Sequence, residues 1–96
     1  MYGTIARLQV RPGKLDALRS FGSEEVDDLP ALRFQHVFQS DTNPNEVWLV
    51  VGFESREAYK SNAESPEQHE RYLRFRELLD ADPEWHDGEL IDSLTR

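Results

Sequence analysis

The 96-residue sequence contains no cysteine, which excludes disulfides, thiolate nucleophiles, zinc–cysteine sites and iron–sulfur clusters. It also has no apolar run of the roughly eighteen residues that a membrane-spanning helix requires. The first ten residues include Arg7 and lack the apolar segment of a signal peptide. These absences predict a soluble cytoplasmic protein with no membrane span.

Basic side chains are scarce, because 11 lysine and arginine residues face 19 aspartate and glutamate residues, for a formal net charge of -8. The average field of such a chain repels phosphate backbones and anionic lipid headgroups, so we expect no nucleic-acid partner and no membrane partner. Apolar residues make up only 38% of the chain, which is lean for a monomer. No repeat or linker divides residues 1–96, so the sequence predicts one domain that shares its core with a second copy.

Periodic patterns along the chain predict an α+β domain. Alternating or strand-forming residues predict strands at residues 2–10, 32–39, 46–53 and 85–94. Apolar side chains at helical spacing predict helices at residues 15–29, 55–62 and 66–79, with Ser55 and Ser65 as N-caps. This order is the βαββαβ pattern of a ferredoxin-like sandwich with an antiparallel sheet.

The third expected strand indicates a partner. From Val47 to Phe53 the residues are continuously apolar, a pattern expected where both faces of a sheet are covered. In the ferredoxin-like order both helical regions cover the same face, so the other face needs cover from outside the chain. A symmetric homodimer is the simplest solution. The alternative is a mildly apolar face left open to solvent.

Several local strings resemble the antibiotic biosynthesis monooxygenase-like family of dimeric α/β barrels. These strings are Val10–Lys14, Asn43–Val50, Phe53–Ala58, Ser65-Pro66 and Pro83–Glu89. The resemblance spans almost the whole chain and implies two ferredoxin-like subunits packed sheet to sheet. It also implies one pocket per subunit, between the sheet and the second helical region. Members of the family include cofactor-free oxygenases of phenolic polyketides or quinols, haem-degrading enzymes, isomerases and proteins with no known activity.

The sequence departs from the haem-degrading members of that family. Those members resemble one another in an asparagine, a tryptophan and a histidine, at places that here hold Arg7 or a neighbour, Asn62 and Tyr72. Other members place a histidine where Asn62 stands and a histidine–aromatic pair where this chain has Glu67 and Gln68. Phosphate-binding loops and metal-ligand spacings are also missing, so we expect no haem, flavin, nicotinamide or metal.

Two residues are candidates for catalysis in a cofactor-free oxygenase, which must deprotonate an electron-rich phenol and stabilise the resulting anion. His36 alternates with Phe34 and Phe38, and an imidazole titrates near neutral pH, so His36 is the candidate base. Arg7 is the only cation of the first strand and the candidate partner of a phenolate or quinone oxygen. The alternatives are a structural histidine, and an ion pair at the sheet edge or the dimer seam.

Five further residues are candidates for binding a substrate: Trp48, Asn62, His69, Tyr72 and Trp85. The two tryptophans supply flat walls, and His69 and Tyr72 share one face of a helix because they are three residues apart. The alternatives are tryptophans that fill the core or the dimer interface, and a solvated helix flank at His69.

Three functional hypotheses follow from these residues. The first is a cofactor-independent monooxygenase that acts on a small aromatic phenol or quinol, with His36 as base and Arg7 as anion stabiliser. The second is a binding protein of the same architecture that holds a small aromatic or lipid-like molecule without turnover. The third is a dimer whose pocket has no function.

Overall fold

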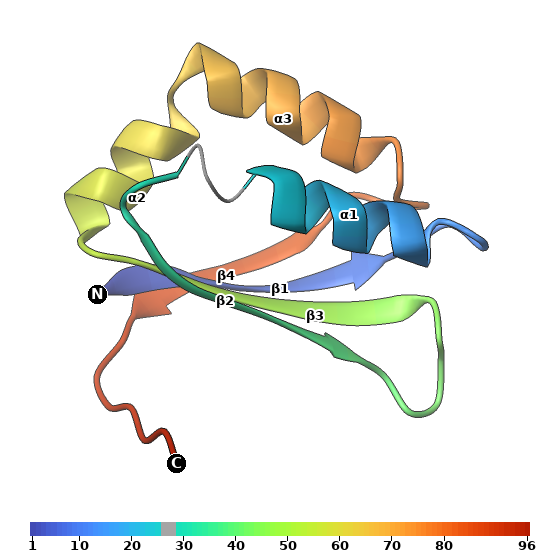
Figure 1. The fold of residues 1–96 in the computed structure, drawn as a ribbon, viewed down its shortest axis with the longest axis horizontal. Coiled ribbons are helices and arrows are strands. Elements are labelled where there is room, and N and C mark those ends of the chain that lie inside the picture. Colours follow the sequence, from blue (N-terminus) through green and yellow to red (C-terminus); the bar gives the residue numbers. More distant parts are fainter. Residues whose placement is uncertain (26–28) are drawn as a thin grey trace.

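The computed structural model describes residues 1–25 and 29–96. Its elements, in chain order, are β1 (Tyr2–Gln9), α1 (Leu15–Glu25), β2 (Leu32–Gln39), β3 (Glu46–Phe53), α2 (Arg56–Ala63), α3 (Pro66–Arg76) and β4 (Glu84–Glu89). The strands form one sheet in the order β2-β3-β1-β4, and every neighbouring pair is antiparallel. Figure 1 shows all three helices on one face of this sheet. The predicted ferredoxin-like α+β fold is confirmed.

The core lies between the helices and the covered face of the sheet. Strand alternation turns Thr4, Ala6 and Leu8 of β1 toward the helices, opposite Val51, Leu49 and Val47 of β3. The buried cluster consists of Ala6, Leu8, Val10, Leu18, Val47 and Leu79. Because Val10 and Leu79 also form an isolated β-bridge, the chain that follows α3 is fastened to the end of β1.

Serine caps position the two helices of the second helical region. Ser55 Oγ accepts a hydrogen bond from the backbone N–H of Ala58, and Ser65 Oγ accepts one from the backbone N–H of Gln68. Pro66 occupies the first turn of α3, where a missing N–H costs no helical hydrogen bond. Both helix starts therefore agree with the sequence prediction. Among the described residues no helix has the length and apolar content needed to cross a lipid bilayer.

Two element ends, those of α3 and β4, differ from the prediction by three residues or more. Helix α3 ends at Arg76, because the chain tightens into a turn in which the N–H of Leu79 donates to the carbonyl oxygen of Arg76. Strand β4 ends at Glu89, not at Leu94. The N–H of Leu90 donates to the carbonyl oxygen of Met1, and residues 91–96 belong to no strand or helix. The expected continuation of the first helix through residues 26–28 lies outside the described residues, and Leu29, where the prediction ends that helix, is not helical.

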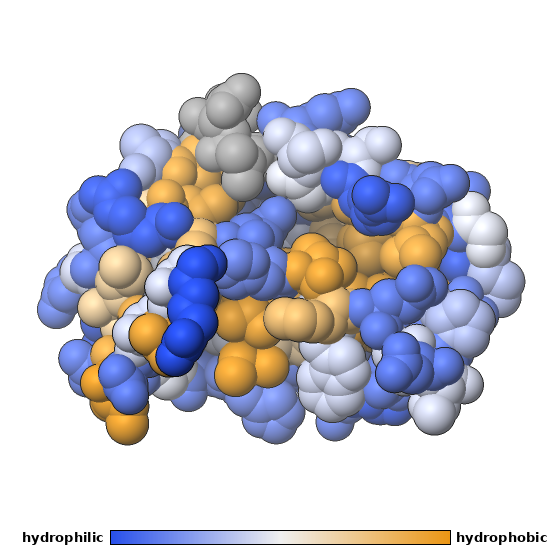
Figure 2. All heavy atoms as spheres, turned by 60° about the horizontal axis from the view of Figure 1, so that its bottom comes forward, coloured by the Kyte–Doolittle hydropathy of each residue, from blue (hydrophilic) through white to orange (hydrophobic). Residues whose placement is uncertain are grey.

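The other face of the sheet carries apolar side chains with no helix over them. Ile5 is 50% exposed, Phe38 61% and Trp48 36%. In Figure 2, which brings the lower side of Figure 1 forward, apolar residues gather over the middle of this face. We call it the bare face. The continuous apolar pattern of β3 therefore has two causes, since Val47, Leu49 and Val51 face the helices and Trp48 and Val50 face the bare side.

Candidate functional site

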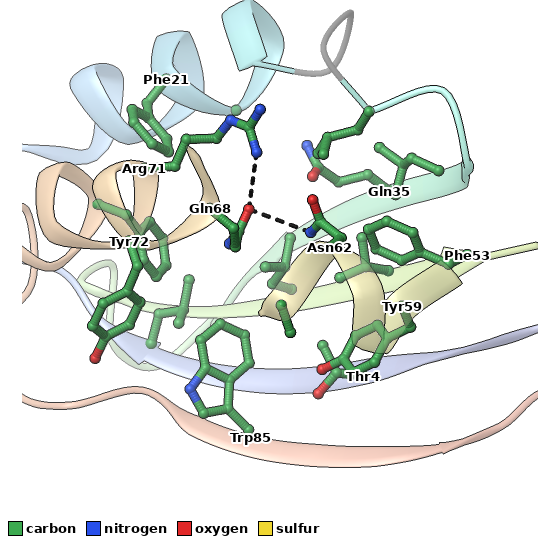
Figure 3. Close-up of a pocket in the computed structure, with 18 of the residues that line it drawn as sticks. Thr4, Phe21, Gln35, Phe53, Tyr59, Asn62, Gln68, Arg71, Tyr72 and Trp85 are labelled. Carbon is green, nitrogen blue, oxygen red and sulfur yellow. Dashed lines mark hydrogen bonds between the residues drawn. The ribbon is translucent and has the colours of Figure 1, made fainter. Parts of the chain in front are cut away.

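A cavity of about 490 Å³ lies between the covered face of the sheet and the three helices. Its aromatic lining comes from five elements: Phe21 of α1, Phe53 of β3, Tyr59 of α2, Tyr72 and Phe75 of α3, and Trp85 of β4. Aliphatic side chains of β1 and β3, including Leu8, Leu49 and Val51, form its floor. The cavity is therefore apolar over most of its surface, and its polar groups are few and grouped (Figure 3).

Phe75 is the centre of the aromatic wall. Its ring centroid lies 6.1 Å from that of Phe21, 6.5 Å from Tyr72 and 6.4 Å from Trp85. These separations are within the range of aromatic packing, so the four rings hold one another in place. The wall offers flat surfaces to a planar ligand.

Three polar side chains from the α2–α3 junction form a second part of the lining, which we call the amide cluster: Asn62, Gln68 and Arg71. Gln68 Oε1 accepts hydrogen bonds from Asn62 Nδ2 at 3.3 Å and from Arg71 Nη1 at 3.1 Å. Ser65 Oγ donates to the backbone carbonyl of Asn62 at 2.9 Å, so the α3 cap also holds the cluster together. Figure 3 shows Gln68 between Tyr72 and Asn62, with Trp85 nearby.

A third group of lining residues contains two hydroxyls. The phenol of Tyr59 donates to Asp87 Oδ1 at 2.9 Å, and its ring packs edge-on against Tyr2 and Phe53. Burial, assisted by the bond to Asp87, raises the pKa of Tyr59 to about 12. Tyr59 is therefore a neutral donor at physiological pH. Thr4 Oγ1 is buried beside it and has no hydrogen-bond partner among the described residues.

Four of the predicted substrate-binding residues line this cavity: Asn62, His69, Tyr72 and Trp85. His69 follows Gln68 on the first turns of α3 and is exposed, so its imidazole lies where the cavity meets solvent. The structure thus brings these side chains together, although they come from α2, α3 and β4. Their roles toward a substrate stay predictions.

The predicted catalytic pair, Arg7 and His36, lies on the bare face together with Trp48. Arg7 pairs with Trp48 across β1 and β3, and His36 pairs with Val50 across β2 and β3. Because strand residues alternate between faces, all of these side chains point away from the helices. The sheet separates them from the cavity, and none of the three lines it.

Arg7 has carboxylate partners on both neighbouring strands. Its Nη1 donates to Glu84 at 2.8 Å and its Nη2 to Glu46 at 3.0 Å, and these bonds raise the pKa of the guanidinium further. These bonds agree with the alternative interpretation of Arg7, that it forms ion pairs instead of binding a substrate oxygen. His36 is exposed, and its ring stacks on Phe34 with centroids 5.7 Å apart. Neither position supports contact with a ligand in the cavity.

Sequence reasoning missed several lining residues, notably Thr4, Tyr59, Gln68, Arg71 and Phe75. In the sequence, Gln68 stood out only as one of the two residues that replace the histidine–aromatic pair of other family members. The signal that would have found it is the spacing of Gln68, Arg71, Tyr72 and Phe75, which places them on one face of α3. In residues 1–25 and 29–96 no three histidine, aspartate or glutamate side chains come together as a metal site.

Comparison with known proteins identifies relatives of this chain. The sequence profile described as antibiotic biosynthesis monooxygenase matches residues 1–77. A Chloroflexus aurantiacus protein that carries that name is 25% identical and has a TM-score of 0.79, over 98% of this chain and 96% of that one. Rv0793 from Mycobacterium tuberculosis is 22% identical, with a TM-score of 0.76 over 98% of each chain. No curated protein shows significant sequence similarity.

Proposed function

The chain belongs to the antibiotic biosynthesis monooxygenase family, and on that premise we propose that its cavity binds a small aromatic molecule of the phenol or quinol type and promotes oxidation of that molecule by dioxygen without a cofactor. The observation that carries the proposal is one cavity that joins a wall of four aromatic rings to a cluster of amide and guanidinium donors. Flat apolar walls suit a planar ligand, and the donors suit an oxygen substituent.

The size of the cavity supports this ligand class. Small-molecule sites usually enclose about 300–1,000 Å³ and combine apolar walls with a few placed polar groups. At about 490 Å³ the cavity accommodates a molecule of two or three fused rings. Two groups of polar side chains in its lining, the amide cluster and the Tyr59–Asp87 pair, offer partners to an aromatic ligand with oxygen functions.

The proposed reaction needs no external reductant. Loss of a proton turns the substrate into an electron-rich anion, which supplies the electrons that reduce dioxygen. When a ring methylene becomes a carbonyl, four electrons pass to dioxygen, one oxygen atom enters the product and the other leaves as water. The protein has to accept the proton, stabilise the negative oxygen and exclude bulk water.

We assign the proton transfer to His69 in place of His36. His69 is the histidine that lines the cavity, and its contact with solvent gives the proton a way out. Gln68 and Arg71 supply donors for the negative oxygen, the role first considered for Arg7. Tyr59 stays protonated because of its raised pKa, so it acts as a donor and not as a base.

The test measures oxygen uptake by the purified protein with a panel of phenols and quinols in air-saturated buffer. His69→Gln should lower the turnover rate by about 10²-fold or more, as loss of a general base typically does. His36→Gln is the matched control, and it should retain wild-type turnover because His36 lies behind the sheet. Loss of activity in His36→Gln alone would contradict the assignment. Saturable binding without oxygen uptake would favour the binding protein instead.

A homodimer and a cytoplasmic location complete the proposal. The bare face exposes Ile5, Phe38 and Trp48 together, and contiguous apolar patches of this kind are uncommon on monomers. A second copy packed sheet to sheet would bury them. The expectation of a cytoplasmic protein rests on the composition, which has no cysteine and a net charge of -8.

A further inference from the structure

We infer that Gln68 determines which ligands the cavity accepts, by presenting an amide N–H donor to a carbonyl oxygen on the aromatic ligand. The inference rests on the proposed function, because it takes an aromatic ligand as given and names the group that such a ligand carries. Among phenol- and quinol-type ligands, the cavity would thus favour those that also carry a ketone or quinone oxygen. Three steps lead to this selectivity.

First, Arg71 fixes the orientation of the Gln68 amide. A guanidinium carries only donors, so the Gln68 atom 3.1 Å from Arg71 Nη1 has to be the oxygen, Oε1. The two ends of a side-chain amide are otherwise hard to tell apart, and here a donor-only neighbour decides between them. The NH₂ group of Gln68 therefore points away from Arg71.

Second, the same oxygen fixes Asn62. Gln68 Oε1 already accepts from Arg71, and Asn62 approaches it at 3.3 Å, so Asn62 has to present its own NH₂ group. Gln68 Oε1 is thereby occupied by two donors. It has little capacity left to accept a hydrogen bond from a ligand hydroxyl.

Third, the Gln68 NH₂ group has no acceptor among residues 1–25 and 29–96. Gln68 is half-buried and lines the cavity between Tyr72 and Asn62. With no protein acceptor, this donor is left to water or to an acceptor on the ligand, and the apolar lining around it favours an acceptor on the ligand. A carbonyl oxygen is such an acceptor, and it has no proton to place.

The variant Gln68→Glu removes the N–H donor of Gln68 and leaves the rest of the amide cluster in place. Glutamate has nearly the same shape, and its carboxylate still accepts from Asn62 and Arg71, so the amide cluster persists while the N–H donor is replaced by an acceptor. Ser61→Glu adds the same charge on α2 at an exposed position outside the lining, and it serves as the matched control. Gln68→Met removes the donor without adding charge.

The probes are 1-tetralone and 1-tetralol, which share a carbon skeleton and differ in a carbonyl against a hydroxyl group. Their dissociation constants come from chemical-shift titration of ¹⁵N-labelled protein, with thermal unfolding as the check on folding. We expect Gln68→Glu to weaken 1-tetralone about 10-fold, and 1-tetralol about 3-fold at most. Gln68→Met should also weaken 1-tetralone, and Ser61→Glu should change neither.

The outcomes separate this inference from the proposed function. Unchanged 1-tetralone affinity in Gln68→Glu overturns the role of Gln68, and so does an equal loss for both probes, while either result leaves the aromatic cavity standing. Failure of the wild-type protein to bind either probe overturns the proposed aromatic ligand and the inference together.

Discussion

Replacing Val50 with glutamate tests whether a second copy covers the bare face. Val50 lies on β3 between Ile5 of β1 and His36 of β2, near the middle of that face. In an isolated subunit the new carboxylate would point into water and cost little. In a dimer packed sheet to sheet it would enter an apolar layer, and two-fold symmetry would place a second one opposite it.

The expected magnitude follows from that symmetry. Moving an unpaired carboxylate out of water costs several kcal/mol, even after the group adjusts its protonation. Taking about 3 kcal/mol for each subunit gives about 6 kcal/mol for the dimer, which corresponds to about a 10⁴-fold weaker association. A wild-type dimer with nanomolar affinity would then separate at micromolar protein concentration.

Sedimentation equilibrium measures the association, and circular dichroism shows whether the separated subunits remain folded. Val50→Thr, which keeps the β-branched shape without a charge, should remain dimeric under the same conditions. The reasoning is refuted if Val50→Glu associates within tenfold of wild type. It is also refuted if the wild-type protein is a monomer at micromolar concentration in physiological salt.

Three further predictions concern stability. Thr4→Val replaces a buried hydroxyl that has no partner with a methyl group, so it should raise the free energy of unfolding by about 1 kcal/mol. The melting temperature should rise by about 4–8 °C. A lower melting temperature at equal protein concentration would contradict this. The pKa of about 12 for folded Tyr59 exceeds the ordinary tyrosine value, so the wild-type protein should lose stability as pH rises from about 10 to 12. In urea unfolding measured across this pH range, Tyr59→Phe should lose on the order of 1 kcal/mol less stability than the wild-type protein. An equal loss of stability in both proteins would count against this. Gly52→Ala should destabilise the fold by about 1–3 kcal/mol, because a Cβ there collides with the ring of Phe34; Phe34→Leu should restore part of the loss.

Local patterns in the sequence were sufficient for most element boundaries. The strands at residues 32–39 and 46–53 are found where the sequence predicts them, and Ser55 and Ser65 cap their helices as expected. The last strand was predicted too long because the residues from Leu90 to Leu94 alternate like a strand. Whether such a segment pairs depends on a neighbouring strand, and the pairing of β4 with β1 ends at Tyr2 and Glu89. That information is tertiary and is not contained in the segment itself.

The candidate site was harder to predict, because alternation groups side chains by face without saying which face holds a cavity. Thr4, Ala6 and Leu8 alternate against Ile5 and Arg7, and the first set faces the helices. Helices with an apolar stripe pack on the more apolar side of a strand. The charge of Arg7 was therefore a signal that the second set faces away from the helices and from the cavity. His36 carried a weaker signal, since Phe34 and Phe38 beside it suit either a pocket or an interface.

The binding groups of the cavity and the bare face lie on opposite sides of the sheet, and this predicts that ligand binding and subunit association are separable. The amide cluster, the aromatic wall and the Tyr59–Asp87 pair all lie on the helix side of the sheet. Residues of the bare face contribute none of them. A second copy on that face would support the floor of the cavity from behind without adding a group that touches the ligand. Folded monomers of Val50→Glu should therefore keep the ligand preference that Gln68 imposes, and loss of that preference on dissociation would mean that the partner completes the site.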